Sequence, residues 1–291
     1  MLSAQNSKEL PRFIDGIGEI AGFYEGYILD LWGVVHDGEQ AFPHTVPTLR
    51  EMKRAKRRVW FLSNAPRRAY TVAEKLSSMG VTPDLYDGIM TSGEATWQAL
   101  QERYLQQWGK RCFHIGGARD HSLFEDMDIT LVDTPDAADF VLCSGIEDFT
   151  HTADMYQDRL AACAEKRLPM ICANPDRIVH VGEKLVICAG TLADIYIQMD
   201  GEVTWFGKPY RQVYSHCLAA MPGMRVLGVG DAMPTDIAGA TGAGIDSVLV
   251  TAGIHRESFE GAAGGGSENR LGEFFTGFPY RPTYLSRGLI W

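Results

Sequence analysis

Residues 27–35 read YILDLWGVV, an apolar run that carries one carboxylate, Asp30, and then reaches a glycine, Gly33. Its apolar, β-branched and aromatic side chains predict a strand over Tyr27–Val35. An aspartate in so apolar a run is costly to desolvate unless a cation or hydrogen bonds receive it, and a metal ion is the simplest recipient. Asp30 could instead cap the strand end or pair with a distant arginine.

Similar short apolar runs recur along the chain, with amphipathic, helix-like stretches between them. This alternation is typical of βαβ units that build a parallel sheet, so we predict an α/β fold. Ligands of open parallel sheets bind beyond the carboxyl ends of the strands, which directs attention to the residues that follow each run. The other predicted strands are Arg58–Leu62, Arg111–Ile115, Asp139–Cys143, Met170–Ala173, Arg225–Val229 and Ser247–Val250.

A second acidic motif follows another of these runs, where residues 226–236 read VLGVGDAMPTD. Asp231 ends the run and Asp236 comes five residues later, with a helix predicted to start between them. Two acids at one strand end can serve a hard, oxygen-preferring cation, directly and through water. The alternative is a strand-to-helix turn with Asp231 as a cap. A dinucleotide loop is disfavoured because Met233 stands where its third glycine is needed.

Two polar motifs could hold an anion. Residues 59–64 read VWFLSN, which places the hydroxyl of Ser63, Asn64 and adjacent backbone amides at a strand end. Residues 206–209 read FGKP, which places Lys208 between a proline and a glycine that lets the backbone approach a ligand. Taken singly, Ser63 is a capping residue and Lys208 a solvated surface charge.

In this order and combination, the four motifs resemble those of the haloacid dehalogenase (HAD) superfamily, specifically its NagD-type (class IIA) phosphatases. The resemblance runs from about Tyr27 to Trp291. It includes residues 172–176, CANPD, which look like the substrate-facing segment of class IIA caps and make Asn174 a candidate substrate-binding residue. It implies a doubly wound, Rossmann-like core with a smaller inserted α/β cap.

The resemblance also implies roles for individual residues. Asp30 would be the nucleophile, Ser63 and Asn64 the phosphate binders, and Lys208 the group that neutralises the charge of nucleophile and phosphate. The cofactor would be Mg²⁺, and the substrate a small phosphorylated metabolite. The ligands of the ion would be Asp30, the backbone carbonyl of Trp32, Asp231 and, through water, Asp236.

The spacing of the motifs accommodates the cap. About 140 residues separate Ser63 from Lys208, too many for a loop and enough for an inserted domain. We predict a cap over residues 83–205 and a discontinuous core over residues 1–82 and 206–291. Such a lid would exclude water and select the leaving group. The sequence does not determine the oligomeric state; caps of this type often mediate dimers in the family, so the resemblance allows a homodimer.

The chain departs from the family pattern at Trp32, where phosphatases of the superfamily carry a second aspartate that acts as general acid and base. Tryptophan does neither at physiological pH, although its backbone carbonyl is retained. Three outcomes are open. The protein is a slow or selective phosphatase with a proton donor borrowed from His36 or Asp37, or a catalytically impaired phosphate-binding or regulatory homologue, or it runs another reaction such as dehalogenation. Asp231 and Asp236 argue against the last, because attack on carbon needs no metal.

His36 and Asp37 also have a structural interpretation. The sequence His36-Asp37-Gly38 is typical of a turn, because Asp-Gly is a common turn dipeptide. We favour a turn or a substrate-shaping role for this pair over acid-base chemistry.

Composition limits the partners and the compartment. The 291 residues carry a formal net charge of −10, which disfavours nucleic acid as a partner. The six cysteines contain no Cys-x-x-Cys pair and read as buried, reduced thiols. The first residues show no signal-peptide pattern, and no run is apolar for long enough to cross a membrane. We therefore expect a cytoplasmic protein without a membrane segment.

Overall fold

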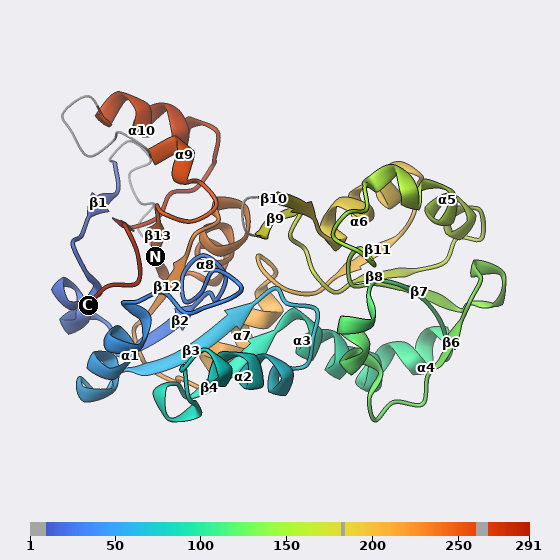
Figure 1. The fold of residues 1–291 in the computed structure, drawn as a ribbon, viewed down its shortest axis with the longest axis horizontal. Helices are drawn as coiled ribbons and strands as arrows, with labels where there is room; N and C mark the ends of the chain where they lie inside the picture. The colour runs from blue at the N-terminus through green and yellow to red at the C-terminus, as the bar shows by residue number, and fades with distance from the viewer. Residues whose placement is uncertain (1–9, 182–183, 260–266) are drawn as a thin grey trace. The chain divides into compact units, whose positions relative to one another are not determined.

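The computed structural model describes residues 10–181, 184–259 and 267–291, so the N-terminal residues, in which no signal peptide is predicted, lie outside the described part. The chain divides into two compact units (Figure 1). The first contains residues 1–62, 76–88 and 214–291, and the second residues 63–75 and 89–213. The predicted domain limits at residues 83 and 205 stay a prediction.

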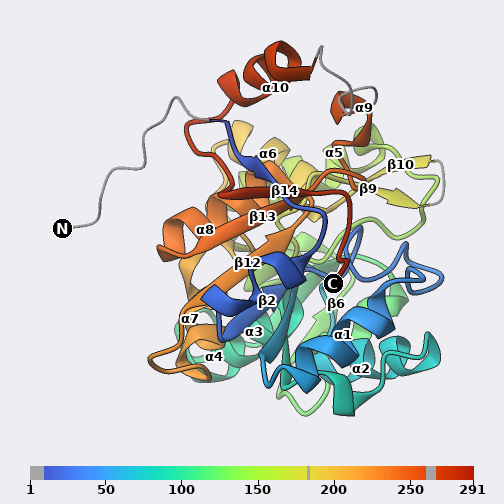
Figure 2. The same ribbon diagram turned by 90° about the vertical axis from the view of Figure 1, so that its left-hand side faces the viewer.

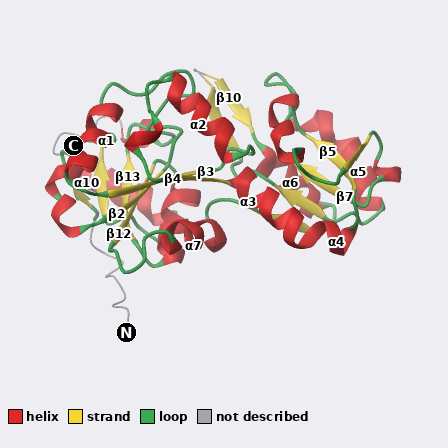
Figure 3. Cartoon of the chain, turned by 90° about the horizontal axis from the view of Figure 1, so that it is seen from below, coloured by secondary structure: helices red, strands yellow, loops and turns green. Residues whose placement is uncertain are grey.

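The first unit is built on a parallel sheet whose strands follow the order β1-β14-β13-β12-β2-β3-β4. The chain order reverses between β2 and β12, and this switch point is where open α/β sheets bind ligands. Helix α1 (Thr45–Arg54) and helix α7 (Arg211–Ala219) cover opposite faces (Figures 2 and 3). The strands of this sheet are β1 (Arg12–Phe13), β2 (Gly26–Leu29), β3 (Arg58–Ser63), β4 (Gly88–Thr91), β12 (Val226–Gly230), β13 (Asp246–Val250) and β14 (Tyr284–Ser286). Strands β3 and β4 begin in the first unit and continue into the second, at Ser63 and at residues 89–91.

The remaining helices of this unit follow the strands on the C-terminal side of the chain. Helix α8 (Ala238–Ala243) continues a single π-helical turn, Met233–Ile237, that begins three residues after the last residue of β12. Helices α9 (Arg256–Phe259) and α10 (Ser267–Thr276) follow β13. Helix α2 (Ala69–Ser78) begins in the second unit and ends in the first.

The second unit has its own parallel sheet, in the order β11-β8-β7-β5-β6. Its strands are β5 (Arg111–Ile115), β6 (Thr130–Val132), β7 (Phe140–Cys143), β8 (Met170–Cys172) and β11 (Val203–Trp205). Its helices are α3 (Ser92–Ala99), α4 (Leu105–Trp108), α5 (Gln157–Glu165) and α6 (Ala189–Gln198). The antiparallel strands β9 (Ile178–Val181) and β10 (Lys184–Ile187) precede α6. The predicted α/β class is confirmed.

All seven predicted strands are present, but the first is shorter than predicted. Strand β2 ends at Leu29, so the prediction of a strand to Val35 was wrong. The carbonyl of Leu31 accepts hydrogen bonds from the amides of Val34, Val35 and His36, and Gly33 has a φ of 80°. These bonds form a tight turn that apolar side chains alone do not reveal, because it depends on one glycine with positive φ.

The cysteines are all free and buried. Burial raises the pKa of Cys143 to about 12 and that of Cys163 to about 12, so these thiols stay protonated and unreactive. Within the described ranges, we find no helix that is both long and apolar enough to cross a bilayer.

Candidate active site

Asp30 lies where β2 ends at the switch point of the core sheet. All four residues of β2 are buried, and the amide of Asp30 donates to the carbonyl of Val229 at 2.8 Å. This bond continues the pairing of β2 with β12 by one residue and fixes the Asp30 backbone. The turn at Leu31 then carries the chain away, which leaves a side chain that is 7% exposed at the strand end.

Asp231 and Asp236 lie on the neighbouring strand end. Asp231 follows Gly230, the last residue of β12, and Asp236 belongs to the π-helical turn. The Oδ2 atom of Asp236 accepts a hydrogen bond from the amide of Ala232 at 3.1 Å, which closes the turn between the two acids. Both side chains are buried, with 7% and 6% exposure.

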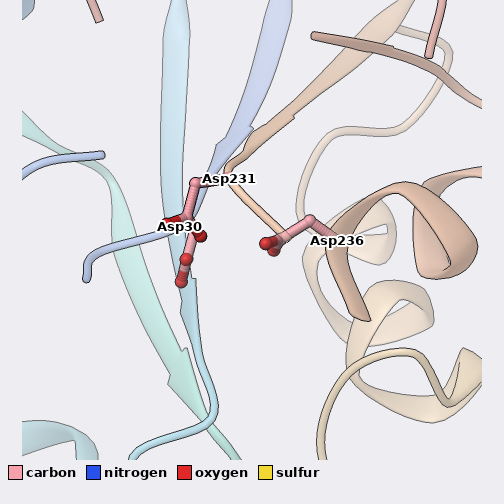
Figure 4. Close-up of side chains that lie close together, drawn as sticks. All are labelled: Asp30, Asp231 and Asp236. Atoms are coloured by element: carbon pink, nitrogen blue, oxygen red, sulfur yellow. The ribbon is translucent and has the colours of Figure 1, made fainter. Parts of the chain in front are cut away.

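The three carboxylates converge on a common space (Figure 4). Each of Asp30, Asp231 and Asp236 offers one ligand oxygen within 4.8 Å of the others. Three buried carboxylates at such short distances would repel one another unless a cation offsets their charge. Oxygen ligands alone suit a hard divalent cation such as Mg²⁺ or Ca²⁺. This donor set therefore fits the metal site that the sequence predicted.

Glycines make room for this cluster. A Cβ atom at Gly33 or at Gly253 would lie 2.1 Å from the Oδ2 atom of Asp231, and one at Gly230 would lie 2.1 Å from the Cγ atom of Asp236. No Cβ atom fits at these distances, so each of the three positions must be glycine for the carboxylates to keep their present places.

The loop after β13 also holds Asp231, and the sequence analysis missed it. The amide of Ile254 donates to the Oδ2 atom of Asp231 at 2.8 Å. The Nε2 atom of His255 accepts a hydrogen bond from the amide of Met233 at 3.1 Å, and burial lowers the pKa of His255, which favours the neutral ring that this bond requires. The sequence offered one indication of this contact: Ile254 and His255 come within five residues of the end of the predicted strand Ser247–Val250.

Substituting Gly253 tests this packing. We expect Gly253→Ala to weaken Mg²⁺ binding by about tenfold or more, because the methyl group displaces Asp231, and changes beside metal ligands typically cost 10 to 100-fold in affinity. Calorimetric titration with Mg²⁺ measures the change. Gly272→Ala in α10 is the matched control, since nothing lies within 4 Å of a Cβ atom there. Unchanged Mg²⁺ affinity in Gly253→Ala would contradict this account of Asp231.

The predicted anion-binding residues belong to the second unit. Lys208 and Asn64 are 3% and 4% exposed, so Lys208 is not the solvated surface charge that it would be if taken singly. Ser63 is the last residue of β3, and its Oγ atom accepts a hydrogen bond from the amide of Ala65 at 3.2 Å. The Oδ1 atom of Asn174 accepts one from the amide of Asp176 at 3.0 Å. Phosphate binding by these residues stays a prediction.

The predicted turn after Trp32 is present. The Oδ1 atom of Asp37 accepts hydrogen bonds from the amides of Gln40 and Glu39, which lower the pKa of this exposed carboxyl. The Nδ1 atom of His36 accepts one from the amide of Gly38 at 3.0 Å. Asp37 therefore stabilises the turn as a carboxylate, which disfavours it as a proton donor.

The Trp32 indole packs within the same turn. A Cβ atom at Gly38 would lie 2.5 Å from the ring of Trp32, and the rings of Trp32 and His36 meet edge to face with centroids 5.7 Å apart. The Trp32 side chain thus packs locally on the turn, and its standing in the place of a family aspartate stays a prediction. Its backbone carbonyl as a metal ligand stays a prediction.

Comparisons with known proteins agree with this geometry. Residues 27–130 match the profile of a family described as haloacid dehalogenase-like hydrolase, and residues 205–267 match one described as HAD-hydrolase-like. The 5'-nucleotidase YutF of Bacillus subtilis is 26% identical over 243 residues, which cover 79% of this chain and 88% of that protein. The D-glycerol 3-phosphate phosphatase of Mycobacterium tuberculosis is 27% identical over 250 residues, which cover 81% of this chain but only 65% of that protein.

A solved structure extends the similarity to almost the whole chain. A haloacid dehalogenase-like hydrolase from Brucella suis superposes with a TM-score of 0.82 and 29% sequence identity, covering 96% of this chain and 100% of that one. The first profile extends into the segment predicted as an insertion, and the second begins at the last residue of that segment; each acidic motif falls within one of the two profiles. The chain therefore belongs to the haloacid dehalogenase superfamily of hydrolases.

Proposed function

We propose that this hydrolase is a Mg²⁺-dependent phosphatase that acts on a small phosphomonoester through an aspartyl-phosphate at Asp30. The convergence of three buried carboxylates at the switch point of the core sheet carries the proposal. The names of the two relatives, a 5'-nucleotidase and a D-glycerol 3-phosphate phosphatase, describe release of phosphate from small monoesters, which supports the same substrate class.

In the proposed reaction, a carboxylate oxygen of Asp30 attacks phosphorus, and the ester oxygen leaves with the electrons of its bond to phosphorus. Water then attacks the phosphorus of the acyl phosphate, which releases inorganic phosphate and restores the carboxylate. Asp30, Asp231, Asp236 and the Trp32 carbonyl would hold Mg²⁺. When bound, this ion would offset the charge of the carboxylates and of the phosphoryl oxygens.

The resemblance assigns further roles to residues of the second unit. The ammonium group of Lys208 would neutralise negative charge on nucleophile and phosphate, and Ser63 with neighbouring amides, including that of Asn64, would orient the phosphoryl oxygens. Asn174 would face the substrate. Positioning and electrostatics supply most of the rate in phosphoryl transfer, so activity can survive without the usual acid at Trp32.

The compartment and the assembly are part of the proposal. Free, buried cysteines fit a reducing environment, and we place the protein in the cytoplasm. A homodimer is proposed from the family resemblance alone.

An assay with p-nitrophenyl phosphate tests the function, because its leaving group needs no protonation. We expect release of p-nitrophenol that requires Mg²⁺, is lost with excess EDTA and returns when Mg²⁺ is restored. Turnover that is insensitive to EDTA would rule out the metal site as part of the reaction. Absence of turnover with bound Mg²⁺ would favour the alternative, a phosphate-binding or regulatory homologue.

A further inference from the structure

The side chain of Asn64 is bonded to the backbone of Lys208, which lies 144 residues later in the chain. Its Oδ1 atom accepts a hydrogen bond from the Lys208 amide at 2.7 Å, and its Nδ2 atom donates to the Lys208 carbonyl at 3.2 Å. Both backbone polar groups of Lys208, the amide and the carbonyl, are thus held by one buried side-chain amide.

The same Nδ2 atom donates a second bond, to the Oδ1 atom of Asp176 at 2.8 Å. A side-chain amide has only two N–H bonds, so both donors of Asn64 are engaged within the protein. The Asn64 side chain therefore has no donor left for a phosphoryl oxygen in this arrangement, although its backbone amide is a separate group.

Gly207 allows the close approach of these segments. Its φ is 123°, a conformation that other residues rarely adopt, and a Cβ atom would lie 2.6 Å from the Oδ1 atom of Asn64 and 2.7 Å from the Cδ atom of Pro175. The glycine before Lys208 is therefore needed for the lysine backbone to reach the Asn64 amide.

The loop that carries Asp176 is itself fixed to α6. The guanidinium of Arg177 donates two bonds to the carboxylate of Asp194, each 2.9 Å long, and another to the carbonyl of Pro175 at 2.9 Å. The amide of Gly190, also in α6, donates to the carbonyl of Asp176 at 3.0 Å. Asp176 therefore offers Asn64 an acceptor at a defined position.

We infer that Asn64 and Asp176 are positioning residues for Lys208, and that the Asn64 side chain acts on phosphate only through the lysine. A lysine side chain has four flexible bonds, so the placement of its ammonium group depends on a fixed backbone. Displacement of a catalytic group by about 1 Å can cost on the order of 100-fold in rate. This inference rests on the role proposed for Lys208 and replaces direct phosphate binding by the Asn64 side chain.

Exchanging the residue types at positions 64 and 176 tests the pair of Asn64 and Asp176, and the double exchange conserves the net charge. Asn64→Asp puts an acceptor where the bond to Asp176 needs a donor, and two carboxylates then face each other. We expect this variant to raise the Kd for inorganic phosphate, measured by calorimetry with Mg²⁺ present, and to lower kcat on p-nitrophenyl phosphate, each by about tenfold or more. Asp176→Asn keeps an acceptor for Asn64 and should change both values by less than about threefold.

The double variant Asn64→Asp with Asp176→Asn is the rescue. The new amide at position 176 donates to the new carboxylate at position 64, which still accepts from the Lys208 amide. The bond to the Lys208 carbonyl is not restored, so part of the lost phosphate affinity and kcat should return. Thermal unfolding identifies variants that fail to fold. A folded double variant as impaired as Asn64→Asp, or an Asn64→Asp variant equal to the wild type, overturns the inference.

Lys208→Met separates positioning from direct contact. If Asn64 acts through the lysine, adding Asn64→Asp to Lys208→Met changes the Kd for phosphate by less than about twofold, whereas a full additional loss shows that Asn64 contacts phosphate itself. Phosphate binding without turnover in the wild type would count against the proposed function alone. Turnover without any effect of Asn64→Asp would count against the inference alone.

Discussion

Asn in place of Asp30 is expected to lower kcat for p-nitrophenyl phosphate by about 10⁴-fold or more. The amide of asparagine is a very poor nucleophile, and loss of a covalent nucleophile removes the whole two-step route rather than one interaction within it. Steady-state assays of the purified variant with Mg²⁺ measure the loss.

Stability provides the control for this variant. Asn and Asp have nearly the same shape, and Asp30 is buried with its oxygen within 4.8 Å of those of Asp231 and Asp236. Removing one of three close carboxylates relieves repulsion, so in EDTA the variant should unfold at the same or a higher temperature than the wild type. A folded Asp30→Asn protein with the wild-type rate would point to another nucleophile or to a contaminating enzyme.

The second large effect concerns the leaving group. Trp32 offers no proton to a departing alkoxide, and general acid catalysis is typically worth ~10² to 10⁴ in rate. We therefore expect kcat/KM for p-nitrophenyl phosphate to exceed that for an alkyl phosphate such as glycerol 3-phosphate by about 10² or more. The two substrates are compared at one Mg²⁺ concentration and one pH.

Two variants of Trp32 show whether the missing acid causes this ratio. Trp32→Asp supplies a carboxyl group and should raise the alkyl rate relative to the aryl rate by about tenfold or more. Trp32→Phe keeps an apolar ring against Gly38 and should leave the ratio unchanged. The ratio is insensitive to the fraction of folded protein, because both rates are measured on the same sample. Equal turnover of the two substrates by the wild type would show that another group donates the proton.

Much of the candidate site could be predicted from the sequence. Asp231 follows an apolar run, and the carboxyl ends of such buried parallel strands meet at one edge of a sheet. Asp30 was predicted inside a strand over Tyr27–Val35, so its meeting with Asp231 and Asp236 was implied by the resemblance to the motifs of the haloacid dehalogenase superfamily and not by the strand pattern.

The packing around those acids could not be predicted in the same way. Gly253 and Ile254 contact Asp231 because β13 lies beside β12 in the sheet, and no residue type marks that proximity in the sequence. The end of β2 at Leu29 was also missed, since the turn depends on backbone hydrogen bonds to a single carbonyl. Apolar periodicity reports which side chains are buried, not where a buried backbone reverses.

By itself, the sequence determined the α/β class, the strand end that carries Asp231, and the presence of a tryptophan at position 32. These properties depend on the identity and spacing of neighbouring residues. Only the tertiary structure decided that Asn64 holds the backbone of Lys208 and that a glycine must face Asp231. Both depend on distances of a few ångströms between segments far apart in the chain, and such distances are set by the packing of the folded protein.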